Sequence, residues 1–197
     1  MQPAAPLKFK IPTGIKPAKG KLLLAQPFMP DHNFTRSVIF LCNHNDNDGS
    51  YGLVLNKELS IRLADALPDL EEFDAPLFFG GPVQPDTLNY LHKVPHLLCG
   101  SEEILDDVFI GGDFEQLKSG ISTKQITAQD IRFFVGYAGW NPGQIEEELK
   151  EDSWIIANGH KRTIFEKKPD QLWKKIMENL GGDYRIMANF PEDLNSN

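Results

Sequence analysis

The sequence predicts one α+β domain in which strands outnumber helices. Short runs of β-branched and aromatic residues recur from residue 20 onward, and such runs are typical of strands. The clearest helical periodicity comes late, after most of these runs. The chain has 197 residues, which is the length of roughly one domain. Its hydrophobic content of 41% is ordinary for a folded protein with a substantial core.

The first 19 residues are expected to form an extended arm. Prolines are interleaved with lysines in this stretch, a composition that favours extended chain over packed structure. These residues are Pro3, Pro6, Pro12 and Pro17 with Lys8, Lys10, Lys16 and Lys19. We find no repeat, low-complexity tract or linker further along, so residues 20–197 are predicted to form the single domain.

Eight apolar runs after the arm have the length of strands. In chain order they are 21–25, 37–42, 51–55, 77–79, 97–99, 108–110, 131–138 and 154–157. The second and third runs are joined by a polar loop, 43–50, whose Asp48-Gly49 pair suits the positive φ of a hairpin turn. We therefore expect these two strands to pair in antiparallel fashion.

Capping residues mark two short helices in the middle of the chain. Ser60 is the expected N-cap of a helix over 61–67. Asp113 is the expected N-cap of a helix over 114–119, which Gly120 would end.

Two further helices are predicted in the last third of the chain. Asn141 followed by Pro142 predicts a helix that runs to about Lys150. A later helix has one apolar face, formed by Leu172, Trp173, Ile176, Met177 and Leu180. The pair Gly181-Gly182 is expected to end that helix.

Composition argues against several classes of function. The formal net charge is −8 and the pI is about 5.1, which opposes binding to phosphate backbones and to anionic membrane surfaces. No stretch approaches the ~18 consecutive apolar residues of a membrane helix, and the N-terminus lacks the apolar core of an export signal. We expect a cytoplasmic protein that binds neither a membrane nor nucleic acid directly.

The two cysteines have no CxxC spacing, which fits reduced thiols with a structural role. Cys42 ends an apolar run, so we expect it to pack as a small hydrophobic residue. A catalytic thiol assisted by His44, two residues further on, is the alternative interpretation.

Potential metal ligands gather around the predicted hairpin. They are Asp31, His32, His44, Asp46 and Asp48. A calcium loop that starts at His44 would have Leu55 in place of the twelfth-position glutamate, which argues against such a loop. His92 and His96 have the spacing of a zinc-protease helix, but Pro95 would break that helix. The sequence therefore predicts no metal and no cofactor.

Two glycine-rich segments are the most unusual feature of the chain. They are 79–83, which contains Gly80-Gly81-Pro82, and 136–144, at a junction between a strand and a helix. Neither belongs to a nucleophile elbow or a phosphate-binding loop. Glycines let a backbone approach another backbone or a ligand, so the segments are either tight turns around Tyr137 and Trp140 or the sides of a binding cleft. We predict that they lie together and line the main concave site.

Residues 127–150 also have features of a helix-turn-helix, because Thr127 and Asp130 form a near capping box. The β-branched and aromatic run 131–137 favours a strand instead. The second helix would carry Glu146, Glu147 and Glu148, which repel phosphate. Direct reading of DNA is therefore not expected.

Several short motifs along the chain, taken together, are more specific than any one of them alone. They are 20–27, Asp31 with Phe34, 37–38, 52–56, 80–83 and 136–140, followed by Gly143-Gln144, Glu148 and Trp154. Together they resemble the YqgE/AlgH family, bacterial proteins without an established activity that are often labelled transcriptional regulators. The resemblance implies a curved, barrel-like, largely antiparallel sheet flanked by helices. The chain departs from the family pattern at Ser50-Tyr51 and at 86–90, where an arginine-glycine pair is common.

Three functions compete on this evidence. The leading hypothesis is a non-enzymatic protein that acts through a small molecule or a protein partner, with any effect on transcription being indirect. The second is an enzyme of unrecognised class, such as a hydrolase, with a cleft between the glycine segments. The third is a direct DNA-binding regulator. The candidate ligand-binding residues are Asp31, His32, Asn56, Gly80, Gly81, Gly136, Gly139, Trp140, Gln144 and Glu148.

Overall fold

The computed structural model describes residues 14–70 and 72–191, so most of the predicted arm lies outside the described residues. The strands are β1 (Lys21–Ala25), β2 (Val38–Asn45), β3 (Gly49–Val54), β4 (Glu58–Arg62), β5 (Pro76–Phe79), β6 (Val83–His92), β7 (Glu102–Leu105), β8 (Val108–Ile110), β9 (Ile131–Trp140) and β10 (Trp154–Asn158). The α-helices are α1 (Leu63–Ala66), α2 (Phe114–Ser122), α3 (Gln144–Lys150), α4 (Lys161–Ile164), α5 (Leu172–Leu180) and α6 (Gly182–Met187). None of these helices is both long and apolar enough to cross a bilayer.

The strands form one sheet that is antiparallel except where β5 runs parallel to β9. Its path through the described residues is β10-β1-β2-β3-β9-β6-β8-β7, with β4 and β5 attached beside β9. The predicted α+β domain with a largely antiparallel sheet is confirmed. The path ends at β10 and β7, so the sheet stays open instead of closing into a barrel.

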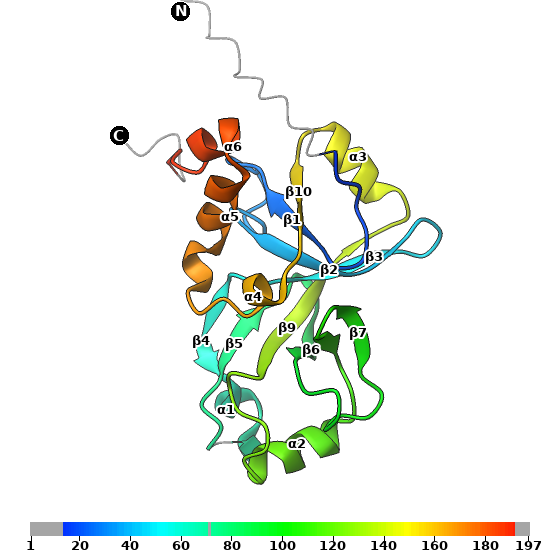
Figure 1. Cartoon of the computed structure of the whole chain (residues 1–197), viewed down its shortest axis with the longest axis vertical. Coiled ribbons are helices and arrows are strands. Elements are labelled where there is room, and N and C mark those ends of the chain that lie inside the picture. Colours follow the sequence, from blue (N-terminus) through cyan, green and yellow to red (C-terminus); the bar gives the residue numbers. More distant parts are fainter. Residues whose placement is uncertain (1–13, 71, 192–197) are drawn as a thin grey trace, which may run out of the picture.

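Strand β9 joins two halves of the molecule (Figure 1). The upper half contains β1, β2, β3 and β10 with α3, α5 and α6, and the lower half contains β4 to β8 with α1 and α2. Its last residues, from Ala138 to Trp140, pair with β3 in the upper half. Its earlier residues pair with β5 and β6 in the lower half. Gly136 lies near the change of partner and has a φ of +66°, which gives the strand a local bend that other residues rarely adopt.

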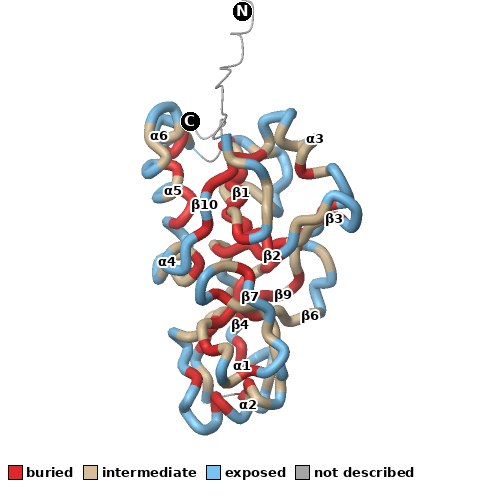
Figure 2. Tube along the Cα trace, turned by 45° about the vertical axis from the view of Figure 1, so that its right-hand side comes forward, coloured by how far each residue is buried: buried red, intermediate tan, exposed pale blue. Residues whose placement is uncertain are grey.

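The upper half has helices on both faces of the sheet, α5 on one and α3 on the other (Figure 1). In β1, Leu22 and Leu24 belong to the same buried cluster as Trp173 of α5. Leu23, which alternates with them, belongs to the cluster of Ile145 on α3. A strand buried on both faces needs a continuous apolar run, and this is why β1 has no polar alternation. Figure 2 shows the resulting buried centre of this half.

The lower half has its own core, in which Leu63 of α1 and Leu117 of α2 pack with Phe133 of β9. Helix α2 is the largest helix of this half and begins as predicted, because the Asp113 carboxylate accepts a hydrogen bond from Gln116 N at 2.9 Å. Gly120 does not end it. The glycine lies inside α2, where a Cβ would come 2.6 Å from Ile126 Cδ1.

Seven of the eight predicted strands are present, and the predicted β2–β3 hairpin is antiparallel. The strand predicted at 97–99 is wrong, because this segment forms turns in which Leu97 N donates to Val94 O. Strands β4, β6 and β7 were not predicted. The first half of β6 is exposed and irregular, and its Pro85 sits in a bulge between Val83 and Leu88, which hides the strand from pattern analysis.

The helix boundaries also need correction. Ser60 lies inside β4, and α1 begins only at Leu63 after an N-cap at Arg62. Gly143, with a φ of +76°, is the N-cap of α3 in place of Asn141. Helix α5 ends at Gly181 as predicted, but the chain continues into the unpredicted helix α6, and α4 was also missed.

Candidate ligand-binding site

The two glycine-rich segments lie against each other. Gly80 N donates to Val135 O at 2.8 Å. A Cβ on Gly80 would lie 2.2 Å from Gly136 O, and a Cβ on Gly81 would lie 2.1 Å from the carbonyl carbon of Tyr137. Contacts this short exclude any side chain. The prediction that the segments lie together is therefore confirmed, and close backbone packing is the physical reason for these glycines.

A cavity of about 590 Å³ opens next to this crossing, between the β2–β3 hairpin and strands β6 and β9. We call it the tyrosine cavity. It is lined by Asn43, Asp48, Gly49, Ser50, Tyr51, Val83, Asn89, Tyr137, Gly139, Trp140 and Asn141. The rings of Tyr51 and Tyr137 meet edge to face, with centroids 6.0 Å apart. Asn89 Nδ2 donates to Gly136 O at 3.2 Å, which ties the lining of the cavity to the glycine crossing.

The lining of the tyrosine cavity is polar and aromatic. It carries three asparagine amides, two phenols, a serine hydroxyl and an indole, and Asp48 is the carboxylate among its described residues. None of these lining residues is a lysine or an arginine. The cavity therefore offers stacking surfaces and hydrogen-bonding groups but lacks a cation that would neutralise a phosphate.

Burial keeps two groups next to this cavity protonated. It raises the pKa of Tyr51 to about 12, and nearby Cys42 and Glu102 add to the effect. Burial also raises the pKa of the Cys42 thiol. At neutral pH, Tyr51 thus offers a hydroxyl hydrogen, and Cys42 stays a buried thiol that is close to Phe40 O at 3.6 Å. This environment favours the structural interpretation of Cys42 over the catalytic one.

A second hollow, of about 310 Å³, shares Gly139 and Trp140 with the tyrosine cavity. We call it the tryptophan hollow. Its lining is Met29, Pro30, Asp31, Phe34, Gly139, Trp140, Gln144, Glu148, Glu151, Ser153 and Trp154. Five of the predicted site residues therefore come together here: Asp31, Gly139, Trp140, Gln144 and Glu148.

The polar groups of the tryptophan hollow bond to one another. Glu148 Oε2 accepts hydrogen bonds from the indole nitrogens of Trp140 at 2.9 Å and Trp154 at 2.6 Å. Its other oxygen accepts from Gln144 Nε2 at 2.8 Å. Gln144 in turn accepts from Asn141 N at 3.0 Å, which closes the turn directly before α3. The carboxylate thus fixes the two indoles against α3, which is a structural role.

The other predicted residues lie elsewhere. Gly80, Gly81 and Gly136 form the crossing and do not line either concavity. The Asn56 side chain accepts from Val38 N at 2.8 Å and donates to Arg36 O at 2.9 Å, so it holds two backbone segments together. His32 is exposed, and its carbonyl accepts from Lys57 Nζ at 3.1 Å. A single cleft that contains all ten residues is not formed.

The sequence analysis missed most residues of the tyrosine cavity as site residues. Val83 and Asn89 belong to β6, a strand that was not predicted, so nothing placed them beside the hairpin. Asn43 appeared only as part of a polar loop. Tyr51 and Tyr137 were noticed within motifs, and two tyrosines in adjacent glycine-containing strands were the signal that was available.

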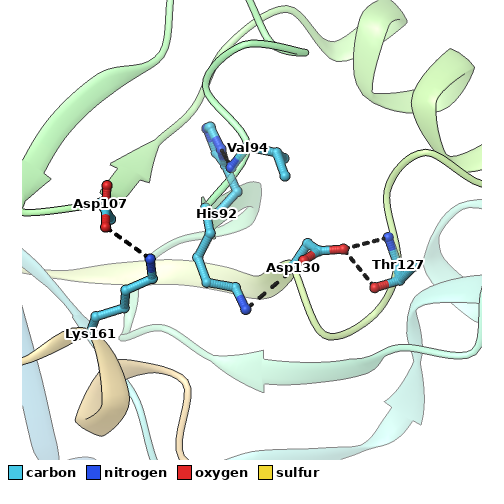
Figure 3. Close-up of polar contacts among 7 residues, drawn as sticks. His92, Val94, Asp107, Thr127, Asp130 and Lys161 are labelled. Carbon is cyan, nitrogen blue, oxygen red and sulfur yellow. Dashed lines mark hydrogen bonds and ion pairs between the residues drawn. The ribbon is translucent and has the colours of Figure 1, made fainter.

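His92 is fully buried, but it is not a metal ligand. Val94 N donates to its Nδ1 at 3.2 Å, and Figure 3 shows the two residues side by side. Its Nε2 lies 3.0 Å from Gly111 O, so the ring is neutral with its hydrogen on Nε2. Burial lowers the pKa of His92. His96 is exposed and lies in a turn, as expected from Pro95.

The segment considered for a helix-turn-helix is not one. Its first part forms β9, not a helix. The Asp130 carboxylate accepts from Thr127 N at 3.0 Å and from Thr127 Oγ1 at 2.6 Å, which closes a turn directly before the strand (Figure 3). The strand prediction for this region is confirmed.

Fold and site together define a mixed α/β single-domain protein with an open ten-stranded sheet and a polar, aromatic cavity where its two halves meet. A family model described as AlgH-like matches residues 22–185. The chain belongs to this AlgH-like family, as its motifs indicated.

Curated relatives and solved structures agree with this assignment. A "UPF0301 protein" of Cytophaga hutchinsonii is 40% identical over 176 residues, which cover 89% of this chain and 96% of the relative. "UPF0301 protein CT0663" of Chlorobaculum tepidum is 42% identical over 173 residues, covering 88% and 92%. The solution structure of the AlgH protein from Pseudomonas aeruginosa matches with a TM-score of 0.69 and 27% identity, over 94% of this chain and 98% of that one. Protein DIP2367 from Corynebacterium diphtheriae shares the fold, with a TM-score of 0.73 at 19% identity, over 89% of this chain and 94% of that one.

Proposed function

We propose that this protein works by binding a small planar molecule without negative charge in the tyrosine cavity. The observation that carries the proposal is the lining: aromatic rings and amides surround about 590 Å³ and no lysine or arginine is among them. This volume falls within the range of small-molecule sites. Any effect on transcription then follows indirectly, through the liganded protein and a protein partner in the cytoplasm.

The chemistry of the lining supports this class of ligand. Tyr51 and Tyr137 offer aromatic surface, and Asn43 and Asn89 offer amides that can pair with the donors and acceptors of a nitrogen heterocycle. Asp48 at the cavity disfavours an anion, and the net charge of −8 acts in the same direction.

Catalysis is less well supported, because two of the candidate polar residues, Glu148 and Asn56, are engaged in structural hydrogen bonds. Glu148 accepts three hydrogen bonds, and both ends of the Asn56 amide are bonded to backbone. The division into an arm over residues 1–19 and a domain over residues 20–197 stays a prediction.

The proposal is tested first by native mass spectrometry of the purified protein, which detects a molecule that copurifies. Thermal shift with matched probes follows: adenosine against adenosine monophosphate, and guanosine against guanosine monophosphate. We expect a nucleoside to raise the melting temperature more than its phosphorylated partner does, because the cavity lacks a cation.

A pair of variants locates the binding. Asn43→Trp places a large ring at the cavity, whereas Asn47→Trp places the same ring at the exposed hairpin turn outside the lining. Binding should be lost in the first variant and retained in the second. Tighter binding of the monophosphates, or the absence of any ligand whose signal depends on Asn43, would contradict the proposal.

A further inference from the structure

A second cluster of polar side chains lies where the β2–β3 hairpin meets α3. It consists of His44 from β2, Asp46 from the turn and Glu146 from α3. His44 Nε2 lies 3.4 Å from Glu146 Oε1 and 3.9 Å from Asp46 Oδ1. One ligand atom of each residue lies within 4.8 Å of the other two, so the three groups converge on one point.

A residue outside the cluster sets the orientation of the histidine ring. Ser50 is the cross-strand partner of His44 in the hairpin, and its Oγ lies 2.8 Å from His44 Nδ1. When Nδ1 donates its hydrogen to this hydroxyl, Nε2 turns its lone pair toward Glu146 and Asp46. The imidazole is largely enclosed, with 13% of its side chain exposed, so it cannot turn away easily.

Three electron-rich groups that face one point repel each other unless a cation lies between them. Two cations are available in principle, a proton on Nε2 or a metal ion. Ligand atoms about 2.1 Å from a tetrahedral zinc ion are about 3.4 Å apart, which matches the separation of His44 and Glu146. Asp46 is 0.5 Å further away, but its side chain is 91% exposed and free to rotate inward.

We propose that His44, Asp46 and Glu146 bind a divalent transition-metal ion, zinc in the first instance, with water completing its coordination. One imidazole and two carboxylates suit zinc better than magnesium or calcium, which take oxygen ligands. The sequence contains His44 and Asp46 as candidate ligands, but their third partner comes from a distant helix. Folding alone brings Glu146 to the hairpin, and this is why the sequence predicts no metal. The inference does not rest on the function proposed for the tyrosine cavity.

Calorimetric titration with zinc chloride alone tests the site in the full chain, after treatment with a chelator and at near-neutral pH. We expect one equivalent to bind to the native protein. His44→Gln and Glu146→Gln should each lower the affinity by at least about 10-fold, since each removes a ligand. His32→Gln and Glu147→Gln are matched controls, because both residues are exposed and lie outside the cluster, and they should bind zinc as the native chain does.

Ser50→Ala keeps all three ligands and removes only the group that orients the ring. It should weaken zinc binding by about 10-fold, which a role of Ser50 in the hairpin alone would not cause. The Nε2 resonance of His44 should also shift on addition of zinc. The proposal is overturned if the native chain binds no zinc, if zinc binds equally to His44→Gln, or if the Nε2 resonance reports only a proton.

Discussion

The tyrosine cavity and the tryptophan hollow share Gly139 and Trp140, yet they use their polar groups differently. In the hollow, Glu148 and Gln144 bond to indoles, to backbone and to each other. In the cavity, Asn43 and Asn141 are exposed at the edge of open space. The hollow contains seven of the motif residues, and its hydrogen bonds hold the sheet and α3 together. The tyrosine cavity also has motif residues in its lining, among them Val83 and Tyr137, whereas its asparagines and Tyr51 lie outside the motifs.

The largest effect is expected at the glycine crossing next to both regions. Gly136→Ala should destabilise the protein by about 3 kcal/mol or more, because Gly136 has a positive φ and its Cβ would lie 2.4 Å from Gly81 O. Gly139→Ala is the control: Gly139 is exposed, and a Cβ there meets only side chains, so the change should stay within about 1 kcal/mol. Urea unfolding of both variants measures the contrast. Equal losses would show that the crossing is not tightly packed.

The next largest effect is expected at Glu148, and it tests whether the tryptophan hollow serves stability while the tyrosine cavity serves binding. Glu148→Ala leaves two indole N–H groups without their acceptor and should lower the free energy of unfolding by about 2 kcal/mol. Glu148→Gln retains an acceptor oxygen and should recover part of that loss. Glu147→Gln, on the exposed side of α3, should change stability by less than about 0.5 kcal/mol. If the native chain binds a nucleoside, Glu148→Gln should bind it with unchanged affinity; a loss of binding would join the two regions into one site.

Gln144→Ala should have a smaller effect, of about 1 kcal/mol, since it removes one bond to Glu148 and one to Asn141 N. The sequence alone suggests an exposed residue at a helix start, whose substitution would change the free energy of unfolding by no more than roughly 0.5 kcal/mol. Thermal unfolding of the variant distinguishes these values. A cost at the lower value would mean that solvent replaces both hydrogen bonds.

The smallest effect at neutral pH concerns His92, a buried residue of β6 that lines neither the tyrosine cavity nor the tryptophan hollow. Burial lowers its pKa below the ordinary value of 6.5, so the unfolded chain takes up a proton that the folded chain resists. Stability should therefore fall as the pH drops below about 6.5 and be unaffected above it. The decrease of the melting temperature with falling pH should be smaller in His92→Gln than in the native chain. It should be unchanged in His96→Gln, because His96 is exposed. If the melting temperature of His92→Gln depends on pH as strongly as that of the native chain, His92 is not the cause of the pH dependence.

Local patterns in the sequence were sufficient for the elements with strong signals. The apolar run of β1, the turn residues of the β2–β3 hairpin and the amphipathic face of α5 each predicted the observed element. Patterns failed where tertiary contacts decided the conformation. Leu98 is buried in a turn, so its hydrophobicity falsely indicated a strand. Strand β6 carries a proline and exposed polar residues, because a bulge and a half-exposed edge accommodate them.

The sequence by itself determined the family and the fold class, because these depend on local residue type. It also predicted that the two glycine segments meet, but the close backbone packing that explains their glycines is visible only in the structure. The tertiary structure alone decided which side chains share a space. It divided the ten candidate residues between a crossing, a hollow and two loops, and it placed Asn89 of β6 and Tyr51 of β3 in the lining of one cavity. It also placed Glu146 within 3.4 Å of His44. Such meetings depend on the path of the chain through three dimensions, and residue spacing along the sequence carries no record of that path.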